Sequence, residues 1–219
     1  MKEAGAAMLS VCEIFRSIQG ESTFAGLPCV FVRLSGCNLR CRYCDTTYAS
    51  APGEPMIVDQ VLARVATLPG DLVEVTGGEP LLQPGTPVLL EALAAQGRTV
   101  LLETNGSLPL PSPRRCRAIM DLKCPSSGEA DKIHWENLDR LQPGDELKFV
   151  MSDRADFDWA VTVIRERRLD QVGYPLLFSP AFGALDPRLL ADWILDSGLT
   201  VRLHLQLHRL IWPGVERGV

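Results

Sequence analysis

Three closely spaced cysteines have the clearest capacity for chemistry in this sequence. Cys37, Cys41 and Cys44 form a C-x3-C-x2-C pattern in a loop that also contains Gly36 and Asn38. Thiolates this close in sequence can reach one metal centre without help from distant parts of the fold. A structural zinc site takes four protein ligands, whereas an iron–sulfur cluster held by three thiolates leaves one iron open to another molecule. The spacing therefore indicates an iron–sulfur cluster, or a zinc site that needs a fourth ligand.

The remaining cysteines carry less information. None has a paired spacing with another cysteine, so small, buried, inert thiols explain them best, although one could complete a zinc site. The chain has seven cysteines in total, an odd number that favours metal binding or catalysis in a reducing compartment over disulfides. The loop 35–55 that carries Cys37, Cys41 and Cys44 is called the cluster loop below. The four cysteines outside it are Cys12, Cys29, Cys116 and Cys124.

Polar residues also follow two predicted strands. Gly77-Gly78-Glu79-Pro80 comes directly after the predicted strand 72–75, and Glu103 and Asn105 come after the predicted strand 99–102. By themselves these segments are most simply turns, because a Gly-Gly pair is a common loop element.

The segment 201–208 alternates leucine or valine with polar residues. A strand over this segment would place Arg202, His204, Gln206 and His208 on one face, because side chains alternate with period two. That face is either the solvated side of an edge strand or the polar interior of a barrel. Two of the chain's three histidines lie on it.

The elements that must position these residues alternate between strands and helices. Strands are predicted at 30–34, 72–75, 99–102, 118–122, 146–150 and 174–178, and helices at 57–68, 87–95, 153–167 and 187–197, with a loop at 35–55. This alternation predicts βαβ units and a parallel sheet. Five to seven strands are too few for a closed eight-stranded barrel, so we expect an α/β fold with an open, partial barrel.

Composition narrows the class of protein. The 219 residues suit a single domain, and 46% hydrophobic with 22% charged residues is ordinary for a soluble chain. A net charge of −5 argues against non-specific nucleic-acid binding. No apolar run approaches the roughly 20 residues of a membrane span, and residues 1–11 lack the apolar core of a signal peptide. We therefore expect a cytoplasmic protein with no nucleic-acid or membrane partner.

The cysteine triplet, followed one βα unit later by Gly-Gly-Glu, resembles the radical S-adenosylmethionine (SAM) superfamily. Further segments are similar to 7-carboxy-7-deazaguanine synthases, and together they cover nearly the whole chain. They are FRSIQGES at 15–22, GLP at 26–28, FVRL at 31–34, GCNLRC at 36–41, YCDT at 43–46, TGGEP at 76–80, ETNG at 103–106, DLKCPSS at 121–127 and QLH at 206–208.

The resemblance implies a reaction and its cofactors. The family converts 6-carboxy-5,6,7,8-tetrahydropterin to 7-carboxy-7-deazaguanine with release of ammonia, toward queuosine and other 7-deazapurine nucleosides. A reduced four-iron four-sulfur cluster cleaves SAM, and the resulting radical removes a hydrogen from C6 of the substrate. Mg²⁺ is expected beside the substrate. An electron donor such as flavodoxin or ferredoxin is expected, and a homodimer is expected by analogy.

The resemblance also assigns residues to these ligands. Cys37, Cys41 and Cys44 would hold the cluster, and the Thr46 hydroxyl would bind Mg²⁺. Glu79 would accept a hydrogen bond from the SAM amino group. Residues bordering SAM would be Tyr43, Cys44, Asp45, Gly78, Asp121, Leu122, Lys123, Phe178, Ser179, Pro180 and Ala181, with Glu103 and Asn105 as weaker candidates. Substrate would contact Ile18, Gln19, Gly20, Glu21, Arg33, Thr76, His208 and Pro213, with Lys148 ranked below Arg33.

The same resemblance implies three segments of the chain, and rival functions remain to be weighed against it. Residues 1–29 would form an N-terminal extension with the substrate-binding segment, 30–206 the partial barrel, and 207–219 a tail that closes the site. Relatives often end near a proline that binds substrate, whereas here six residues follow Pro213. The rival interpretations are another small radical SAM enzyme such as a glycyl-radical activase, a zinc-binding module without activity, and a descendant that binds the cofactors without turnover.

Overall fold

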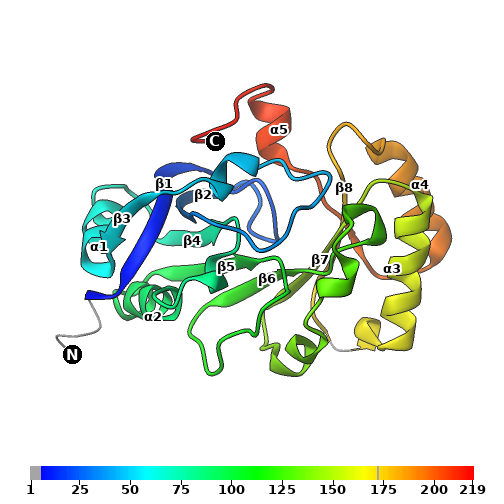
Figure 1. Cartoon of the computed structure of the whole chain (residues 1–219). Helices are drawn as coiled ribbons and strands as arrows, with labels where there is room; N and C mark the ends of the chain where they lie inside the picture. The colour runs from blue at the N-terminus through cyan, green and yellow to red at the C-terminus, as the bar shows by residue number, and fades with distance from the viewer. Residues whose placement is uncertain (1–5, 172) are drawn as a thin grey trace.

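A nine-stranded sheet organises the computed structural model, which describes residues 6–171 and 173–219. Residues 1–5 of the predicted N-terminal extension lie outside the described residues. Figure 1 shows the sheet with helices along its outer side. The strands are β1 (Met8–Ile18), β2 (Pro28–Leu34), β3 (Glu54–Ile57), β4 (Leu72–Gly77), β5 (Thr99–Thr104), β6 (Arg117–Asp121), β7 (Glu146–Met151), β8 (Leu176–Pro180) and β9 (Arg202–Leu203).

Five α-helices and several short 3-10 turns connect the described strands. The α-helices are α1 (Val58–Ala66), α2 (Thr86–Ala95), α3 (Arg154–Glu166), α4 (Pro187–Ser197) and α5 (Leu207–Ile211). The 3-10 turns are η2 (Thr47–Ser50), η3 (Pro80–Leu82), η4 (Pro125–Ser127), η5 (Ala130–Lys132), η6 (Trp135–Arg140) and η7 (Leu169–Gln171). The predicted alternation of strands and helices from residue 30 to residue 197 is therefore confirmed.

The sheet is open and mostly parallel. Its strand order is β3-β1-β2-β4-β5-β6-β7-β8-β9, with β3 and β9 as its two edges among the described residues. The pairs from β2 to β9 are parallel, whereas β1 runs antiparallel to both β2 and β3. The partial βα barrel expected from the sequence is confirmed. Strand β1 precedes the first predicted strand, and β3 occupies the end of the predicted loop 35–55, where it pairs with β1.

Apolar side chains explain how helices and sheet pack. In α1 the buried residues are Val58, Val61 and Val65, spaced by three and four positions so that they share one face. The Gln60 side chain accepts a hydrogen bond from the Ile57 main-chain N–H, which fixes where this helix begins. A second, smaller group of buried apolar residues packs on the opposite face of the sheet. It consists of Cys29, Phe31, Leu72, Leu101 and Ile119.

The predicted strand over 201–208 is wrong. Only Arg202 and Leu203 pair with β8, and α5 begins at Leu207. The chain leaves the sheet because the Leu207 main-chain N–H donates to the carbonyl of Gly20, which lies in the segment after β1. The polar residues therefore do not share a strand face, and His204 is buried while Leu203 is 40% exposed.

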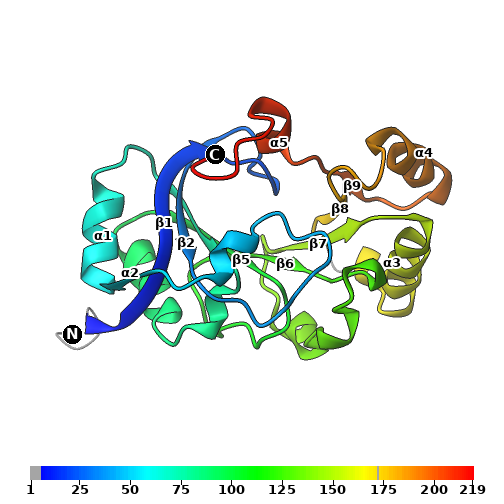
Figure 2. The ribbon, with the colours of Figure 1, turned by 45° about the horizontal axis from the view of Figure 1, so that its top comes forward.

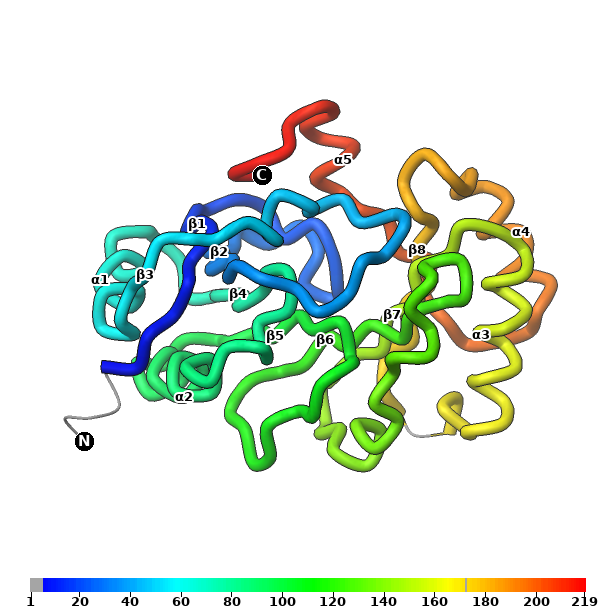
Figure 3. The backbone as a smooth tube through the Cα atoms, in the orientation of Figure 1, coloured from blue at the N-terminus to red at the C-terminus, as the bar shows by residue number. Residues whose placement is uncertain are grey.

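This arrangement gathers three segments at the carboxyl ends of the parallel strands. Figure 3 shows the cluster loop between β2 and β3 crossing above β4, β5 and β6. Figures 1 and 2 both show α5 on this side, with the C-terminal end of the chain near β1 and β2. The segment that joins β1 to β2 completes the enclosure through the Gly20–Leu207 hydrogen bond.

Candidate active site

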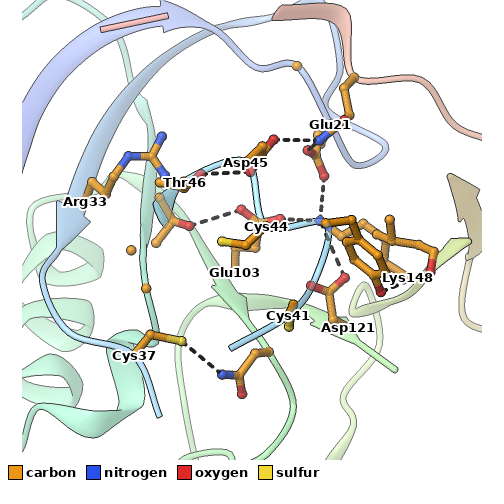
Figure 4. Close-up of a pocket in the computed structure, with 18 of the residues that line it drawn as sticks. Glu21, Arg33, Cys37, Cys41, Cys44, Asp45, Thr46, Glu103, Asp121 and Lys148 are labelled. Carbon is orange, nitrogen blue, oxygen red and sulfur yellow. Dashed lines mark hydrogen bonds and ion pairs between the residues drawn. The ribbon is translucent and has the colours of Figure 1, made fainter. Parts of the chain in front are cut away.

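A cavity of about 540 Å³ lies at the carboxyl ends of the parallel strands. Its wall combines the cluster loop, the segment after β1, the ends of β2, β4, β5, β6 and β7, and α5. This is the position at which ligands of open α/β sheets collect. Figure 4 shows the polar side chains that enter the cavity from these elements.

The three cluster-loop cysteines all line this cavity. All seven cysteines of the chain are unpaired, so no disulfide competes for these thiols. The Cys37 sulfur accepts from the Leu39 main-chain N–H at 3.4 Å, and the Asn105 side-chain amide lies 3.9 Å from it. Hydrogen bonds to sulfur are one means by which proteins tune an iron–sulfur cluster.

The donor set fits a cluster better than a single ion. Within residues 6–171 and 173–219, no three His, Cys, Asp or Glu side chains converge closely enough to hold one metal ion. Cys37, Cys41 and Cys44 nonetheless face one cavity, as Figure 4 shows. Thiols that share a cavity without meeting at a point suit a cluster, where each binds a different iron atom. No fourth cysteine lines the described cavity.

The Gly-Gly pair lets β4 end directly against the cluster loop. A Cβ atom at Gly78 would lie 2.7 Å from the Cβ of Cys37 and would also collide with the Gly36 carbonyl. A Cβ at Gly77 would collide with the carbonyl of Leu34 on β2. Glycine is thus required here for close packing, and the pair fixes the backbone that carries Cys37.

A lysine surrounded by carboxylates occupies one side of the cavity. Lys148 of β7 contacts Glu21 and Glu103, and its Nζ lies 3.6 Å from Asp121 Oδ1. Burial alone would lower the pKa of Lys148, but the three carboxylates outweigh it and raise that pKa well above its usual value. Burial would likewise raise the pKa of Glu21, and the Lys148 charge lowers it instead. Lys148 and Glu21 therefore stay ionised at neutral pH.

A second buried pair lies next to it on β6 and the loop that follows. Lys123 Nζ is 2.6 Å from Asp121 Oδ2, and both side chains are about one-tenth exposed. Burial acts to lower the pKa of Lys123, but the Asp121 charge raises it. The other oxygen of Asp121, Oδ1, is buried without a hydrogen-bond partner among the described residues. A buried carboxylate oxygen that accepts no hydrogen bond at a cavity wall is suited to a ligand that donates one.

The cluster loop and α5 meet at Asp45. Its Oδ2 accepts from Gln206 Nε2 at 3.0 Å and lies 3.5 Å from Arg209, while Oδ1 accepts from the Thr46 hydroxyl at 2.8 Å. Burial alone would raise the pKa of Asp45, but His208, Thr46 and Arg209 together lower it. The Gln206 amide also donates to Glu21 at 3.0 Å. One side chain therefore joins the cluster loop to the segment after β1.

Glu74 is a cavity residue for which the sequence predicted no role. It lines the cavity from β4, is 3% exposed, and accepts from the Gln19 side chain. Burial and the nearby Glu103 charge raise its pKa well above the usual value. The signal was present, because Glu74 is a carboxylate in an otherwise apolar strand and stands two residues before Thr76, on the same strand face.

Glu79 does not line the cavity. Its carboxylate is fully buried and accepts from the main-chain N–H groups of Leu81 and Asn105 and from the Thr104 hydroxyl, at 2.7–3.0 Å. Burial raises its pKa to about 7 despite these hydrogen bonds. In this structure the carboxylate ties η3 to the end of β5, and the Glu79 side chain does not reach the cavity wall.

Most predicted site residues do meet at this one cavity. The predicted residues that line it are Ile18, Gln19, Gly20, Glu21, Arg33, Cys37, Cys41, Tyr43, Cys44, Asp45, Thr46, Thr76, Gly78, Glu103, Asn105, Asp121, Lys123, Lys148, Ala181 and His208. The predicted residues that do not line it are Glu79, Leu122, Phe178, Ser179, Pro180 and Pro213. Pro180 instead lines a second, smaller pocket, and Val219 rather than Pro213 is the tail residue at the main cavity.

Some residues of the wall had no signal in the sequence. Arg209 of α5 and Phe182 after β8 reach the cavity only because the chain turns toward it after β8 and β9. Gln206 belonged to a recognised motif, but its two partners, Glu21 and Asp45, are far from it in the sequence. Contacts of this kind depend on the three-dimensional arrangement and have no local pattern.

Comparison with known proteins gives a consistent picture. The Radical SAM superfamily profile matches residues 31–133. A 7-carboxy-7-deazaguanine synthase of Koribacter versatilis is 46% identical over 96% of this chain and 100% of its own length, and one of Chlorobaculum tepidum is 49% identical over 97% and 98%. The crystal structure of QueE from Escherichia coli superposes with a TM-score of 0.69 at 20% identity, covering 91% of this chain and 94% of that one.

Proposed function

Because the chain belongs to the 7-carboxy-7-deazaguanine synthase family of radical SAM enzymes, we propose that it converts 6-carboxy-5,6,7,8-tetrahydropterin to 7-carboxy-7-deazaguanine and ammonia. The observation that carries this proposal is that three unpaired thiols share one cavity with an arginine and a buried lysine–carboxylate cluster. Substrate and product differ by one molecule of ammonia, so the conversion needs no net oxidant or reductant.

Cys37, Cys41 and Cys44 would hold a four-iron four-sulfur cluster, with SAM on the open iron. When bound, this pair supplies the radical that removes the hydrogen from C6 of the substrate. The protein orients the two ligands and excludes water. The buried Asp121 oxygen that accepts no hydrogen bond, with Lys123 beside it, supports contacts to SAM from β6 and the loop after it. The Glu79 carboxylate would help SAM indirectly, by tying η3 to the end of β5 beside the cavity.

The substrate would lie between β2 and β7. Arg33 on β2 would pair with its carboxylate, because a guanidinium matches a carboxylate in two parallel hydrogen bonds. On the other side, Lys148 and Glu21 offer a donor and an acceptor to the pterin ring, and Gln19 and Glu74 form the floor. His208 packs on Gly20, where a Cβ would lie 3.2 Å from the His208 main-chain nitrogen. This contact supports a role for the Gly20 backbone beside the substrate.

Mg²⁺, the electron donor and the assembly complete the proposal. The Thr46 hydroxyl and the Asp45 carboxylate, which are hydrogen-bonded at the cavity wall, are oxygen donors of the kind that Mg²⁺ prefers. A flavodoxin or ferredoxin would supply electrons in a reducing, cytoplasmic setting, which suits unpaired cysteines. A homodimer is proposed by family analogy. No helix among the described residues has the length and apolar character to cross a membrane.

The direct test is turnover under anaerobic conditions. Reconstituted enzyme is incubated with SAM, a reductant, Mg²⁺ and the carboxytetrahydropterin, and the product is identified by mass spectrometry. We expect 7-carboxy-7-deazaguanine and equimolar ammonia. Cys44→Ala should abolish both, whereas Cys12→Ala, a half-buried cysteine on β1, should not. Absence of this product from the fully loaded enzyme would refute the assignment.

A further inference from the structure

The Arg33 guanidinium is hydrogen-bonded through only one of its three nitrogens among the described residues. Its Nε donates to Glu13 Oε1 at 2.9 Å, and the two side chains are 14% and 17% exposed. Its two terminal nitrogens, Nη1 and Nη2, have no hydrogen-bond partner among the residues that the structure describes. Because Arg33 lines the cavity, these two nitrogens are available to a ligand, and Figure 4 draws them on the side opposite Lys148 in that view.

The Glu13–Arg33 contact is built into the sheet. Glu13 of β1 and Arg33 of β2 are directly paired across the antiparallel ladder, and the register shifts between Val11 and Glu13. Such an irregularity re-aims the side chains that follow it. One pair further along the same face, Phe15 and Phe31 stack with ring centroids 5.0 Å apart. The Arg33 guanidinium carbon lies 5.8 Å from the Phe15 ring centroid, so this stack supports it from one side.

A tyrosine of the cluster loop completes the support. The Tyr48 hydroxyl donates to the same Glu13 Oε1 at 2.7 Å, and its ring centroid lies 5.9 Å from the Arg33 guanidinium carbon. The outer side of this ring is covered by Arg217 of the tail, with 4.4 Å between guanidinium carbon and ring centroid. Glu13 therefore accepts two hydrogen bonds that fix its own orientation as well as that of Arg33.

We propose that Glu13 and Tyr48 are positioning residues that aim the terminal nitrogens of Arg33 at the substrate carboxylate. This inference rests on the proposed function, which assigns that carboxylate to Arg33. A guanidinium anchored through Nε keeps its terminal edge in a fixed plane, and bidentate pairing with a planar carboxylate depends on that plane. Without Glu13 the charge of Arg33 remains, but the plane of its guanidinium is no longer fixed.

The test compares ligands with and without the carboxylate. Anaerobically reconstituted enzyme with SAM is titrated with 6-carboxypterin, a fully oxidised analogue with no hydrogen on C6, and with pterin, which lacks the carboxylate. In Glu13→Ala we expect about a tenfold weaker affinity for 6-carboxypterin and an unchanged affinity for pterin. Glu13→Gln keeps an oxygen acceptor and should stay within about threefold of the wild type, and Tyr48→Phe should lose about threefold.

Controls separate positioning from general damage. Glu91→Ala on α2 and Tyr174→Phe, whose hydroxyl donates to the Leu141 carbonyl, remove similar groups far from the cavity and should bind both ligands normally. Turnover by Glu13→Ala should show a raised KM with kcat within about threefold of the wild type. In Arg33→Ala, the added Glu13→Ala change should cost no further affinity.

Three results would overturn the inference. One is an equal loss of affinity for both ligands in Glu13→Ala, which would mean that Glu13 only maintains the fold. The second is a normal affinity for 6-carboxypterin in that variant while Arg33→Ala loses it. If Arg33→Ala also binds 6-carboxypterin normally, the assignment of the carboxylate to Arg33 fails instead, and this inference fails with it.

Discussion

Lys148 pairs with three carboxylates that come from different parts of the chain, Glu21, Glu103 and Asp121, and Glu21 and Glu103 pair with no other cation among the described residues. Its side chain is 5% exposed, so its removal leaves negative charges close together with little water to screen them. We expect Lys148→Met to lower the free energy of unfolding by about 2–4 kcal/mol, allowing for the partial exposure of Glu21 and Glu103. Urea unfolding measures this change.

Lys132→Met is the matched control for that experiment. Lys132 pairs with Asp131 at 2.6 Å, but both side chains are more than half exposed. Surface pairs of this kind contribute little because water screens them. We expect no measurable change in stability for this variant. An equally small effect of Lys148→Met would contradict the stabilising role given to Lys148 among its buried carboxylate partners.

Glu79 makes stability depend on pH. Burial raises its pKa from 4.5 to about 7, so the folded chain favours the protonated carboxyl. Its stabilising contribution is complete below pH 4.5 and is lost as pH rises through about 7. The difference corresponds to about 3 kcal/mol. Glu79→Gln removes the titration.

The measurement for Glu79 is equilibrium unfolding of the cluster-free chain at several pH values from 4.5 to 8. The wild-type value minus the Glu79→Gln value should fall by about 3 kcal/mol across this range. Glu91→Gln, at an exposed glutamate of α2, serves as the control. A wild-type minus Glu79→Gln difference that stays constant with pH would show that Glu79 does not titrate in this way.

At the scale of elements, the close approach of β4 to the cluster loop is the critical packing contact. Gly78→Ala places a methyl group against Cys37 and the Gly36 carbonyl, so the loop must move. We expect this variant to retain less than about a tenth of the wild-type iron after reconstitution, because a shift of about 1 Å is large for a metal site. Iron analysis of the purified protein measures this loss.

Gly97→Ala separates loss of iron from loss of stability. Gly97 has a φ of 81° after α2, and a Cβ atom at this position would have no described neighbour within 4 Å. Alanine there strains the backbone without crowding the cluster loop. We expect about 1 kcal/mol of destabilisation with normal iron content. Equal iron content in the two variants would contradict the role assigned to Gly78.

Local patterns predicted the parallel strands well and the remaining elements less well. The strands β2, β4 and β5 are runs of buried apolar residues bounded by glycine or polar turns, which is a strong signal. β1 was missed because its burial is irregular and interrupted by the register shift. The strand predicted at 201–208 failed because a tertiary contact, from Leu207 to Gly20, outweighs the alternating pattern.

The candidate site divides in the same way. The cysteine triplet and the Gly-Gly-Glu segment are contiguous motifs, so the sequence alone locates them. The partners of Lys148 could not be predicted, because they depend on the register of β7 against β6 and on the position of the segment after β1. Glu79 was recognised as a motif residue, but its hydrogen bonds to Thr104 and Asn105 could not be inferred from local sequence.

At the scale of the whole molecule, Gln206 joins the two halves of the cavity through Glu21 and Asp45. We expect Gln206→Ala to speed hydrogen–deuterium exchange both in the cluster loop and in residues 18–22, because each segment loses a tether. Mass spectrometry of the exchanging peptides measures it, with Gln142→Ala as a control outside the cavity. Faster exchange in one segment alone would show that the two are not coupled through this side chain.

The central claim is that three thiols hold an iron–sulfur cluster with one iron open to SAM. Iron and sulfide analysis of anaerobically reconstituted enzyme tests it, together with the electron paramagnetic resonance spectrum of the reduced protein before and after SAM is added. The account predicts about four irons and four sulfides per chain, and a spectrum that changes when SAM binds. Stoichiometric zinc without iron, or a cluster whose spectrum ignores SAM, would contradict it.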